Sequence, residues 1–125
     1  MKTVPPTAAE LAILRVLWRE GPSTVREVHK AVYAGTEIGY TSSLKLMQNM
    51  LAKGLVTRVE EARQHIYTAA ASERPTLNQL VSGWMDSAFA GSSVALAMQA
   101  LDARPVAADE LAQLKALIEK LENDS

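Results

Sequence analysis

The 125-residue chain is long enough for one modest core, or for a small domain with an appendage that needs a partner to cover it. It has no cysteine, which excludes disulfides and thiolate chemistry, and no stretch approaches 18 uncharged apolar residues, so we expect a cytoplasmic protein without export or a membrane span. The net charge of −1 averages two unlike halves: residues 1–71 carry nine basic and six acidic side chains, and residues 72–125 carry four basic and eight acidic ones. A head of +3 joined to a tail of −4 is typical of a polyanion-binding domain with a non-binding appendage.

Two amphipathic helices are expected near the start of the chain. Thr7 and Glu10 have the spacing of a capping box, which predicts a helix over residues 8–20. A second helix of roughly ten residues should follow, capped by Ser23 or Thr24. Apolar side chains recur at helical spacing in both, so each helix should pack one face against a common core.

A third helix, expected between Tyr40 and Gly54, has two unlike faces. At about 100° per residue, one arc of about 140° holds no large apolar side chain. This polar arc consists of Thr41, Ser42, Lys45, Gln48, Asn49, Ala52 and Lys53. The opposite arc consists of Leu44, Leu46, Met47, Met50 and Leu51, with Ser43 as its one small polar side chain. We therefore expect the apolar arc to pack against the core and the polar arc to present hydrogen-bonding side chains to solvent.

A β-hairpin is expected next, with strands over residues 55–59 and 64–68. Three helices followed by a hairpin is the order of a winged helix-turn-helix. An irregular stretch then interrupts the pattern and places the domain boundary after residue 71. The predicted fold is mainly α with a small β-hairpin: a winged helix-turn-helix DNA-binding domain over 1–71, followed by a helical dimerisation domain over 72–125.

The C-terminal segment should be helical and should need a partner. Thr76 is predicted to cap a helix over about 76–90, and two more helices should follow it. Apolar side chains recur along the first and the last of these helices at spacings that suit packing of one helix against another. We predict that they form the interface of a two-fold homodimer. The predicted interface residues are Leu77, Leu80, Val81, Trp84, Leu111, Leu114, Ile118 and Leu121.

The chain resembles the penicillinase-repressor family of bacterial winged-helix regulators, which includes beta-lactamase, methicillin-resistance and copper-responsive repressors. The order and spacing of several pieces carry this resemblance over nearly the whole chain. They are residues 9–14 with Leu17-Trp18, residues 25–28, residues 40–47, residues 53–56 and Tyr67-Thr68. The resemblance implies a homodimer that represses a promoter by binding an inverted repeat. It also implies a beta-lactamase-type or stress-response operon, an antibiotic response, and a membrane metalloprotease sensor that acts indirectly.

Some positions depart from the family pattern. The wing turn often has Gly before Arg, whereas this chain has Ala62-Arg63. The last helix often begins with a Ser cap, whereas Ala107 stands here, which should cost about 1 kcal/mol of helix stability. The Asn-Phe pair that is cleaved in beta-lactamase members corresponds to Gln99-Ala100, so we expect no induction by cleavage at this bond. Without cysteine, copper sensing through thiolates is not expected either.

The polar arc and the wing supply the candidate DNA contacts, because a recognition helix must offer hydrogen-bonding groups to base edges while cations and hydroxyls hold phosphates. The base-edge candidates are Ser42, Lys45, Gln48 and Asn49. The phosphate-side candidates on the helix are Tyr40, Thr41 and Lys53, and those on the wing are Arg58 and Arg63. For Arg58, a surface ion pair with Glu60 or Glu61 is the alternative.

No enzyme, cofactor or metal is expected, because the chain has no Gly-rich phosphate loop, nucleophile elbow or His/carboxylate cluster. His29 and His65 are expected to be ordinary, partly exposed side chains. Trp18 and Trp84 are expected to be anchors of the core and of the dimer. The alternative function is a winged-helix protein-interaction module without DNA. Salt dependence separates the two, because phosphate contacts weaken steeply with salt and an apolar docking surface does not.

Overall fold

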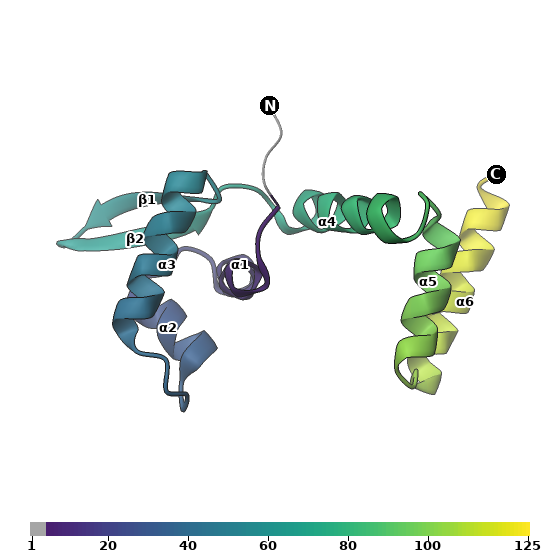
Figure 1. The fold of residues 1–125 in the computed structure, drawn as a ribbon, viewed down its shortest axis with the longest axis horizontal. Helices are drawn as coiled ribbons and strands as arrows, with labels where there is room; N and C mark the ends of the chain where they lie inside the picture. Colours follow the sequence, from purple (N-terminus) through teal and green to yellow (C-terminus); the bar gives the residue numbers. More distant parts are fainter. Residues whose placement is uncertain (1–4) are drawn as a thin grey trace. The chain divides into compact units, whose positions relative to one another are not determined.

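The computed structural model describes residues 5–125, and the chain divides into two compact units, one ending at Val81 and one running from Ser82 to Ser125. Six helices and two strands lie within the described residues (Figure 1). They are α1 (Ala8–Glu20), α2 (Val25–Tyr33), α3 (Tyr40–Lys53), β1 (Val56–Glu61), β2 (Gln64–Ala69), α4 (Glu73–Ala88), α5 (Ser93–Ala103) and α6 (Ala108–Asn123). The predicted fold class, mainly α with one small hairpin in winged-helix order, is therefore confirmed.

Capping boxes begin both α1 and α2. The Thr7 hydroxyl accepts from the Glu10 amide at 3.2 Å, and the Glu10 carboxylate accepts from the Thr7 amide at 2.9 Å. Thr24 and Glu27 repeat this arrangement, so Thr24 is the cap of α2. The other predicted candidate, Ser23, instead exchanges two backbone hydrogen bonds with Tyr67 of β2, which ties the start of α2 to the hairpin.

One core joins the three N-terminal helices to the hairpin (Figure 1). Burying an aliphatic side chain of this size stabilises a fold by roughly 1.5–3 kcal/mol, so the core determines which face of each helix points inward. Because the methionines of α3 belong to it, the polar arc of α3 has to point outward. The core residues are Ile13, Leu14, Val16, Leu17, Val25, Val28, Met47, Met50, Val56 and Tyr67.

The wing is an antiparallel hairpin whose register runs from Val56 opposite Ala69 to Glu61 opposite Gln64. Its two turn residues, Ala62 and Arg63, both have positive φ values, of 49° and 66°. Two positive φ values are the pattern of the tight turn that suits a twisted hairpin, although Asn and Gly are the usual residues there. A non-glycine residue in this region is strained by roughly 1–2 kcal/mol. The departure noted at Ala62-Arg63 therefore leaves the hairpin intact but strained.

Helix α4 begins three residues earlier than predicted, so the assignment of Thr76 as its cap was wrong. Thr76 is buried inside the helix, and its hydroxyl donates to the Ser72 carbonyl at 2.9 Å. The irregular stretch expected after the hairpin, over residues 69–75, ends with Pro75. Pro75 instead lies in the first turn of α4, where the missing N–H of a proline costs no helical hydrogen bond.

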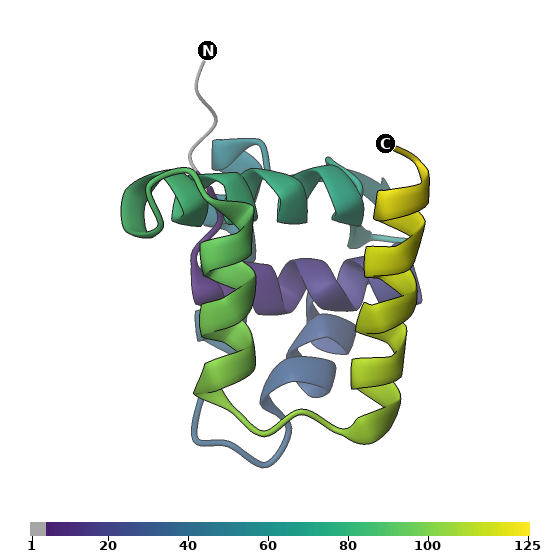
Figure 2. The same ribbon diagram turned by 90° about the vertical axis from the view of Figure 1, so that its right-hand side faces the viewer.

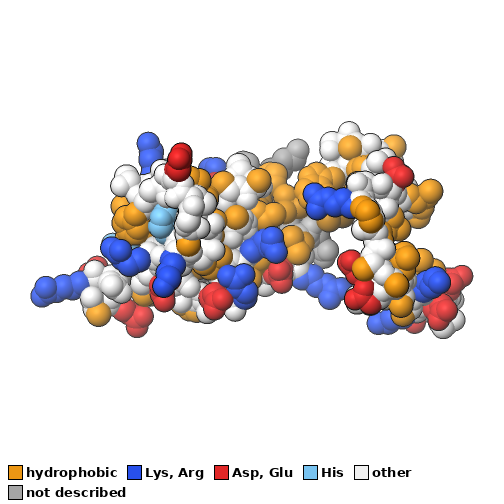
Figure 3. Space-filling view, turned by 90° about the horizontal axis from the view of Figure 1, so that it is seen from below, with side chains coloured by type: hydrophobic (Ala, Val, Ile, Leu, Met, Phe, Trp, Pro, Cys, Tyr) orange, Lys and Arg blue, Asp and Glu red, His pale blue; other side chains and the backbone are white. Residues whose placement is uncertain are grey.

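Helices α5 and α6 run antiparallel and are joined by a short loop (Figure 2). Ser92 caps α5 through a 3.0 Å bond from the Ala95 amide, whereas Ala107 gives α6 no side-chain cap. No residue of α5 or α6 is buried. Hydrophobic side chains consequently lie open on these helices (Figure 3). None of the helices between residues 5 and 125 is long and apolar enough to cross a membrane.

Candidate nucleic-acid interface

The outward face of α3 carries every helix residue predicted to contact DNA. All seven are solvent-exposed: Tyr40, Thr41, Ser42, Lys45, Gln48, Asn49 and Lys53. Behind them Ser43, Met47 and Met50 are buried against the core. The two-faced character predicted from spacing is therefore present, with the polar face exposed and the apolar face packed on the core.

The buried hydroxyl of Ser43 has a partner on the neighbouring helix. Its oxygen lies 2.6 Å from Nδ1 of His29, which belongs to α2. The His29 ring also contacts the rings of Tyr33 and Tyr40, at centroid distances of 5.8 Å and 6.1 Å. His29 is thus more than an ordinary surface histidine, because it links α2 to the first turns of α3. Sequence spacing gave no sign of this contact, since His29 and Ser43 lie on different helices.

Lys53, predicted to face phosphate, already has a carboxylate partner. Its Nζ lies 2.7 Å from Oε2 of Glu10, whose side chain is only 2% exposed. Burial alone raises the pKa of Glu10, but the bonds from Lys53 and from the Thr7 amide outweigh it, and the net pKa lies below its usual value of 4.5. The pair joins the last turn of α3 to the first turn of α1. About half of the Lys53 side chain remains exposed.

The two predicted wing cations lie in different surroundings. Arg58 on β1 lies beside Tyr67, with its guanidinium carbon 6.0 Å from the ring centroid and Nη1 3.5 Å from the phenol oxygen. This aromatic neighbour takes the place of the ion pair with Glu60 or Glu61 that was the alternative. Arg63 is exposed in the turn at the end of the hairpin.

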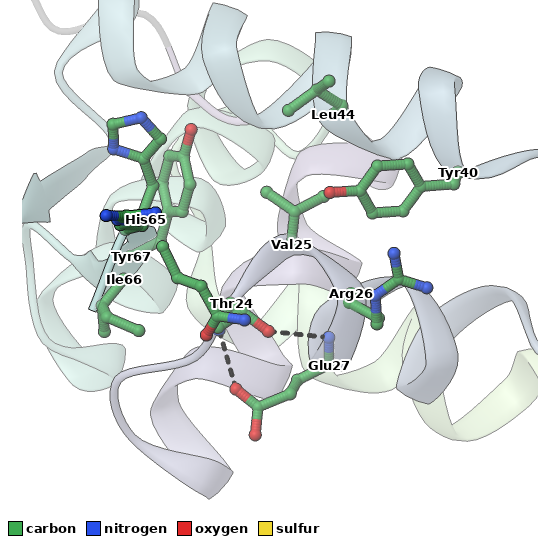
Figure 4. A pocket seen from close by; sticks show the side chains of 11 residues that line it. Thr24, Val25, Arg26, Glu27, Tyr40, Leu44, His65, Ile66 and Tyr67 are labelled. Atoms are coloured by element: carbon green, nitrogen blue, oxygen red, sulfur yellow. Dashed lines mark hydrogen bonds between the residues drawn. The ribbon is translucent and has the colours of Figure 1, made fainter. Parts of the chain in front are cut away.

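A groove of about 600 Å³ separates the start of α2 and α3 from the returning strand of the wing (Figure 4). Arg26 stands on one side of it, with its guanidinium carbon 5.2 Å from the centroid of the Tyr40 ring. Arg63, Gln64 and His65 line the other side. Sequence reasoning missed Arg26, because it lies one helix away from Tyr40 and no local spacing connects the two.

The geometry defines a class of protein: a winged helix with an exposed polar helix beside a hairpin that carries two arginines. No three His, Asp or Glu side chains among residues 5–125 are grouped so that they could hold a metal ion.

Comparison with known proteins identifies the family. The family model described as Penicillinase repressor matches residues 6–120. Proteins named Transcriptional regulator BlaI, from two strains of Mycobacterium tuberculosis, are each 32% identical over 117 residues, which cover 90% of this chain and 82% of theirs. The chain belongs to the penicillinase-repressor family, and it is a transcriptional regulator and not an enzyme.

A solved structure shares the fold at lower identity. A MarR family protein from Bacillus stearothermophilus matches with a TM-score of 0.52 and 16% identity, covering 97% of this chain and 76% of that one. At this identity the likeness concerns the fold alone.

Proposed function

We propose that the protein is a cytoplasmic repressor that binds an inverted-repeat operator as a homodimer. Helix α3 enters the major groove and the β1–β2 wing lies on the DNA backbone. Residues 1–71 form the DNA-binding domain and residues 72–125 form the dimerisation domain. The observation that carries the proposal is the front of α3, where exposed amide, hydroxyl and ammonium groups are backed by a rigid core in a member of a repressor family.

The side chains of α3 are suited to both parts of DNA recognition. Gln48 and Asn49 can each form two hydrogen bonds with adenine, and Lys45 can reach guanine, with Ser42 beside them. We assign phosphate contacts to the remaining candidates. These are Tyr40, Thr41, Lys53, Arg58 and Arg63. Since Lys53 is bonded to Glu10, its contribution to DNA binding should be smaller than that of the others.

The C-terminal helices support dimerisation, because they have no core of their own. Large apolar side chains stay open to solvent there, including Trp84, Leu111, Ile118 and Leu121. A second copy related by two-fold symmetry would cover them. Leu80, also in the predicted interface, is already buried within the single chain. Two-fold symmetry would place the two α3 helices in major-groove segments about 34 Å apart, which is why the operator should be an inverted repeat.

The regulatory context is proposed from the family. We infer control of a beta-lactamase-type or stress-response operon, with a membrane metalloprotease sensor acting indirectly. The Gln99–Ala100 bond lies within α5, where the helical backbone would have to unfold before a protease could bind it. Release of DNA therefore should not depend on cleavage of this bond.

The test uses a genomic fragment that the purified protein selects from its own genome. Lys45→Ala combined with Gln48→Ala should weaken binding to that fragment at least tenfold in a gel-shift titration, since each lost base contact costs about 1–3 kcal/mol. Lys30→Ala is the control, because Lys30 is exposed on α2 and faces α1 rather than the front of α3.

Unchanged affinity in the double variant would remove α3 from this role. If the folded protein binds no fragment of its genome even at low salt, the DNA-binding function is wrong and the protein-interaction module is favoured.

A further inference from the structure

We propose that Arg26 of α2 is a further phosphate-binding residue, held in place by the ring of Tyr40, and that the groove it borders receives one DNA strand beside α3. The inference rests on the proposed function and extends it to a helix that the sequence did not implicate. The ligand it names is the phosphodiester backbone, with no dependence on base sequence.

The position of Arg26 against Tyr40 leaves its donors available. At 5.2 Å from the ring centroid, the guanidinium is within the range of a cation–π interaction. A guanidinium that rests on an aromatic ring keeps its N–H groups at the edge of its plane, where they can form two bonds to phosphate oxygens. Because the ring restrains the side chain before DNA arrives, less conformational entropy is lost on binding.

Tyr40 is itself held from behind. The His29 ring contacts the Tyr40 ring edge-on, at an interplanar angle of 82°. The Nδ1 atom of His29 is hydrogen-bonded to the buried Ser43 hydroxyl. A continuous series of contacts therefore runs from the interior of α3 through His29 and Tyr40 to Arg26. The orientation of Arg26 is thereby coupled to the orientation of the recognition helix.

The charges around the groove favour an anion. Arg26 and Tyr40 lie on one side of the groove and His65 on the other (Figure 4), and Arg63 also lines it. Glu27 is the one carboxylate among the described residues that line it. That carboxylate is bonded to the Thr24 amide at 2.8 Å as part of the capping box. Because the Glu27 carboxylate occupies the N-terminal start of α2, that helix terminus is not available to an anion. The arginine side chains therefore supply the attraction for phosphate.

The experiment compares full-length variants on two duplexes of equal length, the genomic fragment selected by the wild type and a scrambled one, over a range of salt concentrations. Arg26→Ala should weaken binding to both duplexes by a similar factor, and it should reduce the slope of log affinity against log salt by about 0.9. Arg15→Ala removes the same charge from an exposed position on α1 outside the groove, and both quantities should stay at wild-type values.

A double-mutant cycle tests the role of the Tyr40 ring. In a Tyr40→Phe background the ring remains, so Arg26→Ala should have its full effect. In a Tyr40→Ala background Arg26 has lost its support, so the same substitution should cost less affinity than it does in the Tyr40→Phe background. Arg26→Lys keeps the charge without the planar fork, so it should retain the salt slope while recovering only part of the affinity.

Different outcomes separate this inference from the proposed function. Wild-type slope and affinity in Arg26→Ala, with specific binding lost in the Lys45/Gln48 double variant, would overturn the role of Arg26 alone. An effect of Arg26→Ala confined to the selected fragment would also overturn it, because that result indicates base recognition. Should Arg26→Ala fail to fold by circular dichroism, Arg26→Gln replaces it, because glutamine removes the charge and keeps a polar side chain: a slope that stays at the wild-type value would contradict the phosphate role. Absence of wild-type binding to either duplex would overturn the proposed function itself.

Discussion

The carboxylate of Glu10 serves two parts of the winged helix at once. One oxygen accepts from the Thr7 amide and completes a capping box, and the other accepts from the Lys53 ammonium at the far end of α3. Local sequence predicts the first contact, since the two residues are three positions apart. The second contact joins residues 43 positions apart in the sequence. Lys53, which was predicted to contact DNA phosphate, therefore also fastens α3 to α1.

Glu10→Gln isolates the contact with Lys53, because glutamine can still accept the capping hydrogen bond but carries no charge. We expect the free energy of unfolding to fall by about 1–2 kcal/mol, the value of a charge-assisted hydrogen bond reduced for the exposure of Lys53. Urea denaturation at neutral pH measures it. Glu20→Gln is the control, since Glu20 pairs with Arg19 on the open surface and should contribute little.

The same pair predicts how stability depends on pH. Because the pKa of Glu10 is lower in the folded protein than its usual value of 4.5, its contribution is complete above that value and disappears as pH falls through the folded-state pKa. The stability difference between wild type and Glu10→Gln should therefore shrink below about pH 4.5. A difference that stays constant from neutral pH to pH 3 would contradict the assigned interaction.

At the scale of elements, helix ends account for most of the agreement between sequence and structure. Thr7 and Thr24 begin α1 and α2 through side-chain caps, and Gly54 ends α3 with a left-handed φ of 80°. Each signal acts within a few residues, so it is visible in the sequence. Helix α6 lacks such a signal at its start, because Ala107 offers no side-chain acceptor.

Ala107→Ser should stabilise α6. The backbone of Ala107 already has the extended conformation of a cap, with φ −69° and ψ 152°, and Glu110 stands at the position that completes a capping box. We expect a gain of about 1 kcal/mol in unfolding free energy, measured by thermal or urea denaturation followed by circular dichroism. Ala108→Ser, one residue further on and inside the helix, should give no gain. Equal effects of the two substitutions would show that capping is not the cause.

At the scale of the whole molecule, the two compact units differ in how they bury apolar surface. The N-terminal unit has a core of buried side chains, whereas α5 and α6 bury none, and Trp84 is 52% exposed. Exposed apolar surface of this extent is typical of an interface. This contrast is the structural basis for proposing that the C-terminal helices pair with a second copy.

Trp84→Glu should weaken the proposed dimer, because it would place a charge within an apolar interface. Analytical ultracentrifugation should show a shift toward monomer at concentrations where the wild type is dimeric, while the helical content is retained. Ser82→Glu adds the same charge to α4 about 160° around the helix from Trp84, and it should leave the dimer intact. An undisturbed Trp84→Glu dimer would remove Trp84 from the interface.

Spacing along the chain was enough to predict the order of elements, the Thr7 cap of α1 and the two faces of α3, and it narrowed the cap of α2 to Ser23 or Thr24. These features depend on residues that are close in the chain: a capping box needs a spacing of three, and a helical face needs apolar side chains at spacings of three and four. The misplaced start of α4 shows the limit of such rules, because a proline is compatible with both a break and a first helical turn.

Packing between the helices determines which partners distant side chains find. Lys53 meets Glu10, Ser43 meets His29, and Arg26 rests on Tyr40, all across different helices. A period along one helix contains no information about the facing side chains of another. Those contacts exist only after the core has set the helices against one another, and they determine how the outward face of α3 is held.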